Sequence, residues 1–104
     1  MDILQLTLKK QWFDLIASGD KRFEYREYKP HWWSRLLGKG GIRNYDEVRF
    51  INGYGKDRPF IRIEFNGAAI VEGKYCSPEN NEPLDHDQKY FVISLGEILE
   101  TGNV

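Results

Sequence analysis

The first 28 residues change their hydrophobic spacing twice. The leucines of residues 3–8 alternate with other residues, and this period of two predicts a strand with one buried face. Over residues 10–18 the apolar side chains instead recur at helical spacing, and Gly19 is suited to end this helix in a left-handed conformation. Residues 22–28 alternate again, so we expect a strand, a helix and a second strand here.

The later part of the chain carries mainly the pattern of strands. The further segments that predict strands are residues 47–52, 60–65, 68–74 and 90–95. We expect loops at residues 53–59 and at the polar stretch 77–87. Two turns are predicted, one at Asn66–Gly67 and one that closes the chain at residues 96–99. Residues 31–37 predict a brief second helix, which the following glycines end.

These elements predict one small domain of the α+β class that is mostly β. Five or six short strands with one or two short helices favour a curled sheet, and closure into a small barrel would protect its edges. A chain of 104 residues, 40% hydrophobic and 30% charged, is large enough for one hydrophobic core and too small for two ordinary domains. We therefore interpret residues 1–104 as a single domain.

Charge and composition narrow the classes of partner. The formal net charge of -1 gives no overall attraction to nucleic acid, so any phosphate binding must come from a local basic patch. Cys76 is the single cysteine, which excludes an internal disulfide and favours a reducing, cytoplasmic setting. No apolar stretch approaches the roughly 20 residues that span a bilayer, and the first residues lack the pattern of a secretion signal, so we expect no membrane partner.

The sequence offers little for metal or thiol chemistry. His31 and His86 are too few and too isolated for a zinc site, and residues 85–87 are more typical of a solvated acidic turn. Cys76 lacks the accompanying His and Asn pattern of a cysteine nucleophile, so we interpret it as a small packing residue. We predict neither a metal nor a cofactor.

The strand at residues 22–28 is the strongest candidate for a binding site. One face carries Phe23, Tyr25 and Glu27, and the opposite face carries Arg22, Glu24, Arg26 and Tyr28. Lys21 precedes the strand in a turn, from which its long side chain can swing toward Glu24. The alternative is a row of surface ion pairs without a function, each worth about 0–1 kcal/mol.

The charged residues of this strand predict specific chemistry. Lys21 and Arg26 are suited to hold a phosphate, because Arg offers a planar fork and Lys a mobile point charge. Between two cations, the ionised form of Glu24 should be favoured. Glu24 is then able to accept a hydrogen bond from an amino group of a base, or to orient a water.

Aromatic and basic residues elsewhere supply candidate walls for a cleft. Trp32 and Trp33 lie in a basic stretch that suits stacking on unpaired bases, at about 1–3 kcal/mol per base. Adjacent helix positions cannot share a face, so one of the two tryptophans should pack inward and leave the other exposed. Lys9 adds positive charge near the same cleft, or is simply solvated, as we expect for Lys10.

The loop that begins at Asn52 is a second candidate wall. It combines a side-chain amide, the ring of Tyr54 and two glycines that let backbone N–H groups approach a ligand. The alternative is a plain hairpin connection with the tyrosine ring lying on the barrel.

Residues 6–26 resemble the ASCH domain, whose motif is G-x-K-x-x-E-x-R after a strand and a helix. The motif positions are filled by Gly19, Lys21, Glu24 and Arg26. The resemblance is close over the first quarter of the chain, and the remainder agrees in strand order. It implies a PUA-like β-barrel with a cleft beside the motif, a fold shared with domains that bind RNA. Fold alone does not fix function.

The resemblance implies two functions. Many members are thought to be RNA-binding modules, which implies binding of RNA, a nucleotide or a nucleoside at Lys21, Glu24 and Arg26, with no obligate protein partner evident. Some small bacterial members hydrolyse the acetyl amide of N4-acetylcytidine with a lysine, a threonine nucleophile and a glutamate, and others cleave RNA. Lys21 matches the lysine, Glu24 stands in place of the threonine, and no residue could be matched to the distal glutamate.

We therefore hold two leading hypotheses, beside a third in which the aromatic segment of residues 32–37 is a protein-interaction surface. The first is a binding module for RNA or a nucleotide, in which Tyr54 or a tryptophan stacks on a base. The second is a hydrolase of a modified nucleoside or of RNA, in which Glu24 is a general base and Lys21 stabilises the oxyanion.

Overall fold

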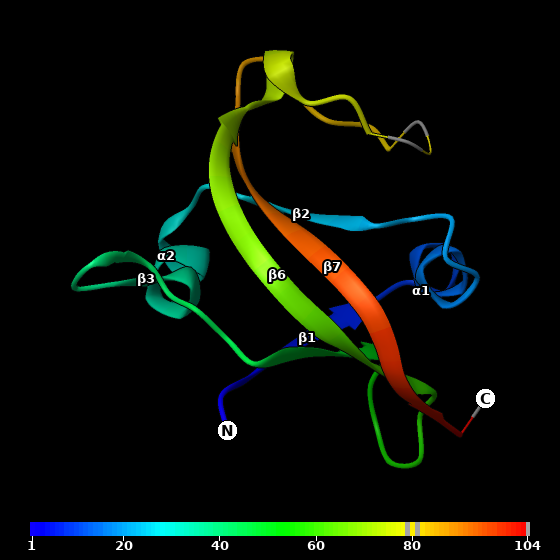
Figure 1. Cartoon of the computed structure of the whole chain (residues 1–104). Coiled ribbons are helices and arrows are strands. Elements are labelled where there is room, and N and C mark those ends of the chain that lie inside the picture. Colours follow the sequence, from blue (N-terminus) through cyan, green and yellow to red (C-terminus); the bar gives the residue numbers. More distant parts are fainter. Residues whose placement is uncertain (79, 81, 104) are drawn as a thin grey trace.

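The computed structural model describes residues 1–78, 80 and 82–103. Its main feature is a five-stranded sheet in the order β1-β5-β6-β7-β2, in which β6 and β7 are long and curved (Figure 1). The strands are β1 (Ile3–Leu8), β2 (Phe23–Glu27), β5 (Glu47–Asn52), β6 (Phe60–Glu72) and β7 (Lys89–Gly102). β1 is parallel to β5, and the other three pairs are antiparallel. The predicted mostly β, barrel-like α+β class is confirmed.

Two short helices and a small hairpin connect these strands. The helix α1 (Lys10–Ala17) joins β1 to β2, and Gly19 follows it with a φ of +86°, the left-handed conformation predicted from the sequence. The helix α2 (Pro30–Leu36) begins with its proline, which suits the first turn of a helix. The two-residue strands β3 (Leu37–Gly38) and β4 (Gly41–Ile42) form a hairpin that the sequence pattern did not predict. A single turn of 3-10 helix, η1 (Gly73–Tyr75), follows β6.

The hydrophobic core takes residues from four sheet strands and both helices. Its buried members are Leu4, Leu6, Leu8, Phe13, Ile16, Leu36, Val48, Phe50, Ile61, Ile63, Phe91, Ile93 and Leu95. The alternating leucines of β1 all point inward, as their period of two predicts. The strand β2 is different, because its buried residue is the carboxylate Glu24 rather than an apolar side chain.

Two predicted turns are wrong. The chain does not reverse at Asn66–Gly67, and the predicted strands on either side of it are parts of the single strand β6. Register shifts between Arg62 and Ala68 disrupt the pairing with β7, and Gly67 there has a φ of +99°. Such bulges bend and twist a strand pair, so the glycine signal marks a bend instead of a turn. Residues 96–99 likewise lie within β7.

The curvature brings the two edge strands, β1 and β2, toward each other. Arg26 on β2 donates a hydrogen bond from Nη2 to the backbone carbonyl of Thr7 on β1, at 3.2 Å. Arg35 on α2 donates from Nη2 to the carbonyl of Gln5 on the same strand, at 2.5 Å. Carbonyls of an edge strand need such partners when no neighbouring strand supplies them. Arginine side chains therefore close the seam between the two edges.

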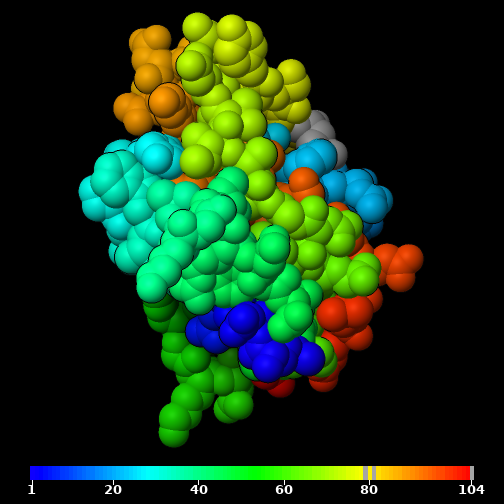
Figure 2. Space-filling view, turned by 60° about the vertical axis from the view of Figure 1, so that its left-hand side comes forward, coloured from blue at the N-terminus to red at the C-terminus, as the bar shows by residue number. Residues whose placement is uncertain are grey.

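The face that carries α2 is turned forward in Figure 2. The segment from α2 to β4 covers the middle of this face, and the first residues of the chain lie beneath it (Figure 2). The connection between β5 and β6 protrudes at the lower edge (Figure 2). Within the part of the chain that the structure describes, neither helix is long and apolar enough to cross a membrane.

Candidate functional site

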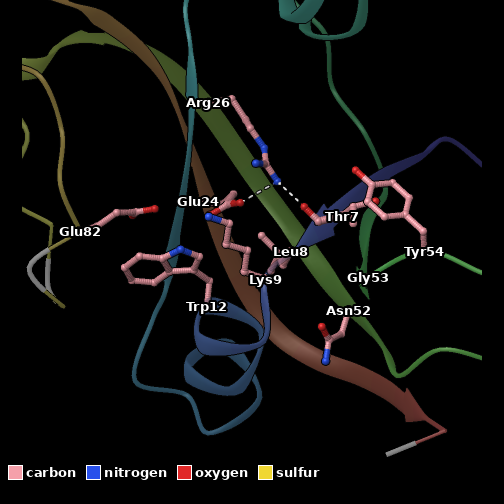
Figure 3. Close-up of a pocket in the computed structure, with 10 residues that line it drawn as sticks. All are labelled: Thr7, Leu8, Lys9, Trp12, Glu24, Arg26, Asn52, Gly53, Tyr54 and Glu82. Atoms are coloured by element: carbon pink, nitrogen blue, oxygen red, sulfur yellow. Dashed lines mark hydrogen bonds and ion pairs between the residues drawn. The ribbon is translucent and has the colours of Figure 1, made fainter.

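A pocket of about 460 Å³ opens beside the seam between β1 and β2. Its lining residues are Thr7, Leu8, Lys9, Trp12, Glu24, Arg26, Asn52, Gly53, Tyr54 and Glu82 (Figure 3). This volume is in the range of small-molecule sites. The structure thus brings together five of the residues that the sequence singled out, namely Lys9, Glu24, Arg26, Asn52 and Tyr54.

Glu24 reaches the pocket because residues of β2 alternate between its two faces. Phe23 points outward and is exposed, whereas the neighbouring Glu24 points inward and is 2% exposed. Its Oε2 atom lies 2.8 Å from Nη2 of Arg26, and the same nitrogen bonds Thr7 across the seam (Figure 3). The predicted alternation is confirmed. A row of solvated surface ion pairs is excluded at this position, because the carboxylate is buried.

Burial sets the protonation chemistry of Glu24. Removal from water raises the pKa of its carboxyl above the ordinary 4.5, and the nearby charges of Arg26 and Lys21 offset this rise only in part. The two cations do favour the ionised form, as expected, but the net shift of the pKa is upward and not downward. Desolvation is the larger effect because Glu24 is almost completely enclosed.

Lys21 supports the pocket from behind and does not line it. Its side chain is 2% exposed, and its ammonium lies 3.6 Å from Glu24 and 2.8 Å from Glu82. The ammonium also lies over the rings of Trp12 and Tyr25, at 5.4 and 5.0 Å from their centroids. The predicted reach of Lys21 toward Glu24 is confirmed. A role of Lys21 in binding a phosphate is not supported, because this buried ammonium is already paired with two carboxylates.

Glu82 is a charged residue of the site that was not predicted from the sequence, and Thr7, Leu8 and Trp12 also line the pocket without having been predicted to do so. Glu82 belongs to the segment between η1 and β7, where the sequence predicted only a polar loop. Its carboxylate is 13% exposed and bonds Lys21, while Asn80 nearby donates from Nδ2 to the carbonyl of Asp20 at 3.3 Å. No periodicity marks Glu82, since a contact across 61 residues depends on how the loop folds back. Glu82 is thus a glutamate distant in sequence that lies beside Lys21.

Two polar groups of the pocket remain available to a ligand. Lys9 immediately precedes α1, and Figure 3 shows its side chain extending toward the Glu24 side of the pocket. No carboxylate among the described residues lies within ion-pair distance of its ammonium. Tyr54 stands on the loop after β5 and is 87% exposed. The pocket therefore offers a cation at one side and an aromatic ring at the other.

The loop after β5 has a defined shape. Gly53 has a φ of +82°, and its backbone N–H donates to the carbonyl of Leu8 at the end of β1. Nε of Arg58 donates to the carbonyl of Asn52 at 2.8 Å. These bonds fix the start of the loop against β1 and thereby position Tyr54 at the pocket rim.

The two tryptophans of α2 divide as predicted. Trp33 is exposed and lies against Tyr28, with 5.2 Å between the ring centroids. Trp32 is partly buried and packs against the core. It does not line the first pocket, so its predicted role as a ligand platform there is not supported; it lines a neighbouring compartment instead.

The part of the chain that the structure describes gives no sign of a metal site or of a reactive thiol. Among the described residues, no group of three or more His, Cys, Asp or Glu side chains is placed to hold a metal ion. Burial raises the pKa of the Cys76 thiol, which disfavours the reactive thiolate. The chemistry of the site therefore rests on carboxylates, cations and aromatic rings.

Comparisons of the chain with protein-family models, with curated proteins and with solved structures find no match. The resemblance to the ASCH domain therefore stays a prediction from the motif.

Proposed function

We propose that this protein is an ASCH-type domain that binds a nucleoside unit, either as a nucleotide or within RNA, in the pocket beside the seam. The observation that carries this proposal is the enclosed pair of Glu24 and Arg26 in the wall of a pocket whose rim holds the exposed ring of Tyr54. Polar groups that fix orientation beside a flat stacking surface are what recognition of a single base requires.

The polar groups suit a base that carries an exocyclic amino group. Glu24 and Glu82 both line the pocket, and a carboxylate accepts hydrogen bonds from such an amino group. Lys9 and Arg26 are donors, which suit the carbonyl oxygen of a base. Tyr54 supplies a ring on which a base of any kind can stack. We therefore expect cytidine to bind more tightly than uridine, which has a carbonyl in place of the amino group.

Equilibrium binding of cytidine and uridine, measured by isothermal titration calorimetry, tests this proposal. Glu24→Gln should weaken cytidine binding about tenfold, because a hydrogen bond to a charged acceptor exceeds a neutral one by about 1–1.5 kcal/mol. Glu27→Gln is the matched control, since Glu27 lies on the same strand and pairs with Lys29 at the surface. Equal affinity for cytidine and uridine, with Glu24→Gln without effect, would reject the proposal.

A second candidate function is hydrolysis of an acylated nucleoside, and the raised pKa of Glu24 favours it. In this reaction Glu24 takes a proton from water while the water oxygen bonds the acyl carbon, and it returns a proton to the nitrogen as the carbon–nitrogen bond breaks. Lys9 or Arg26 would stabilise the oxyanion, because both line the pocket and Lys21 does not. Hydrolysis of RNA would use the same base.

Mass spectrometry of the products after incubation with N4-acetylcytidine or short RNAs distinguishes the two candidates. For a hydrolase, Glu24→Gln should lower turnover at saturating substrate by about a hundredfold or more, and Glu27→Gln should retain it. If the wild-type protein binds these ligands without any turnover, the hydrolase hypothesis is wrong and the binding-module hypothesis stands.

A further inference from the structure

A second compartment of about 390 Å³ adjoins the proposed base pocket. It shares Thr7, Arg26 and Tyr54 with the first pocket, so the two adjoin at the seam, and we call them together the groove. The other lining residues of the second compartment are Gln5, His31, Trp32 and Arg35. The second compartment therefore lies toward α2, on the side of the seam away from Lys21 and Glu82.

The two compartments differ in the charged groups that line them. The first has both signs, because Glu24 and Glu82 line it together with Lys9 and Arg26, and its two carboxylates repel an anion. Among the described residues no carboxylate lines the second, which instead has the guanidinium groups of Arg26 and Arg35. The two compartments have similar volumes. A ligand that fills only the first would therefore make no contact with Arg35 in the second.

Both guanidinium groups are held in place before any ligand binds. Their carbon centres lie 5.0 Å (Arg26) and 5.6 Å (Arg35) from the ring centroid of Trp32. One nitrogen of each donates to a carbonyl of β1, Arg26 to Thr7 and Arg35 to Gln5. Guanidinium groups have five N–H donors, so further donors remain on each side chain. Arg26 is also paired with Glu24 at 2.8 Å, whereas no described carboxylate lies within ion-pair distance of Arg35. Arg35 therefore supplies the unpaired charge and Arg26 further donors, and such a pair suits an oxyanion better than a neutral group, because Arg binds phosphate oxygens through two parallel bonds.

Trp32 thus has a different task from the stacking role that the sequence predicted. It is partly buried and lies next to the two guanidinium groups, and His31 meets its ring edge-on at 4.6 Å between centroids. The ring of Trp32 therefore orients the two guanidinium groups and has no free face on which a base could stack. Tyr54 is the exposed ring, and it lines both compartments at their junction.

We infer that the compartment beside α2 is a phosphate subsite, so that the ligand is a nucleoside phosphate whose base lies in the first pocket. This inference rests on the proposed function, and it adds which residues bind the phosphate of the nucleotide or RNA. The phosphate is either the terminal group of a mononucleotide or the linking group of a single strand, and both present the same oxyanion to Arg26 and Arg35.

Three ligands with the same base test the subsite: cytidine, cytidine monophosphate and a cytidine-containing dinucleotide. Calorimetric titrations at low ionic strength should show that the phosphorylated ligands bind the wild-type protein about tenfold or more tightly than cytidine. Arg35→Met should abolish this advantage and leave the affinity for cytidine within about twofold. Arg43→Met is the matched control, because Arg43 is exposed, lies over the ring of Tyr45 and lines neither compartment.

Each result has a distinct meaning. If cytidine and its phosphorylated forms bind equally, or if Arg35→Met keeps the phosphate advantage, the subsite is wrong while the base pocket stands. If none of the three binds, both proposals fall. Arg35→Lys guards against misfolding, since it keeps one charge and one donor and should retain part of the advantage. Tighter binding of the dinucleotide than of the monophosphate would identify a strand, and equal binding would identify a terminal phosphate.

Discussion

Lys21→Met removes one cation from a buried cluster of charges and keeps most of the length of the side chain. The lysine ammonium lies 2.8 Å from Glu82 and 3.6 Å from Glu24. Glu82 is on a loop and partly exposed, so water can solvate it once its partner is gone. Glu24 is enclosed and keeps Arg26 as its cation at 2.8 Å. We therefore expect the loss of stability to arise mainly at Glu24.

The ordinary pKa of 4.5 sets an upper bound on this loss. A folded protein that cannot stabilise the ionised carboxylate folds with Glu24 protonated instead. At pH 7, uptake of that proton costs about 1.36 kcal/mol for each of about 2.5 pH units, or about 3.4 kcal/mol. Part of this cost is already present in the wild-type protein, because burial raises the pKa of Glu24. The expected loss on removing Lys21 is therefore about 1–3 kcal/mol at pH 7.

The loss should depend on pH in one direction. A carboxyl group whose pKa is higher in the folded than in the unfolded protein binds its proton mainly in the folded state. Stability therefore falls as pH rises from 4.5 through the raised pKa of Glu24. Loss of Lys21 raises the pKa of Glu24 further and widens this interval. The difference between variant and wild type should be small near pH 4.5 and grow toward pH 7.

Urea unfolding followed by circular dichroism between pH 4.5 and 7 measures this difference directly. Lys10→Met is the matched control, because Lys10 makes an exposed pair with Asp14 and its loss should change stability by less than about 0.5 kcal/mol. A loss for Lys21→Met that is constant with pH, or larger at the acidic end, would refute the electrostatic account.

Two further variants address the frame around the site. Arg62→Met should weaken the fold mainly above pH 4.5, because two nitrogens of Arg62 bond Glu47 at 2.7 and 2.9 Å and lower the pKa of Glu47, a stabilisation that is lost as pH falls. In urea unfolding the difference from wild type should shrink on acidification, and growth would contradict this reasoning. Gly53→Ala should lower the melting temperature more than Gly55→Ala, because both glycines have a positive φ but only at Gly53 would the added methyl meet the Arg58 guanidinium, at 3.1 Å. Equal shifts by scanning calorimetry would show that Arg58 moves aside without cost.

Local sequence signals predicted most of the fold. The alternating leucines of β1 and the helical spacing of α1 are each properties of a few consecutive residues, and Gly19 supplied the end of the helix. The signal failed at Asn66–Gly67, where the dipeptide typical of a turn lies in the middle of β6. There the pairing with β7 overrides the local preference, and the extra residues are absorbed as bulges.

The candidate site was predictable only where its residues are close in sequence. Glu24 and Arg26 belong to one strand, so the period of two placed them on one face together. The partner of Lys21 could not be predicted, because Glu82 depends on the path of a loop. The direction of the pKa shift of Glu24 was missed for a related reason, since charge spacing is visible in the sequence and burial is not.

The inward charged face of β2 follows from the open seam of the sheet. An apolar residue in place of Arg26 would leave the carbonyl of Thr7 without its donor and Glu24 without its nearest cation. The same arginine therefore closes the barrel and lines both compartments of the groove. Loss of binding in an Arg26 variant would not separate these two roles. Glu24→Gln keeps the shape of the side chain and leaves Arg26 in place, so it does separate binding from closure. Arg35 also bonds a carbonyl of β1, so for its variants the affinity for cytidine reports closure and the advantage of the phosphorylated ligands reports binding of the phosphate.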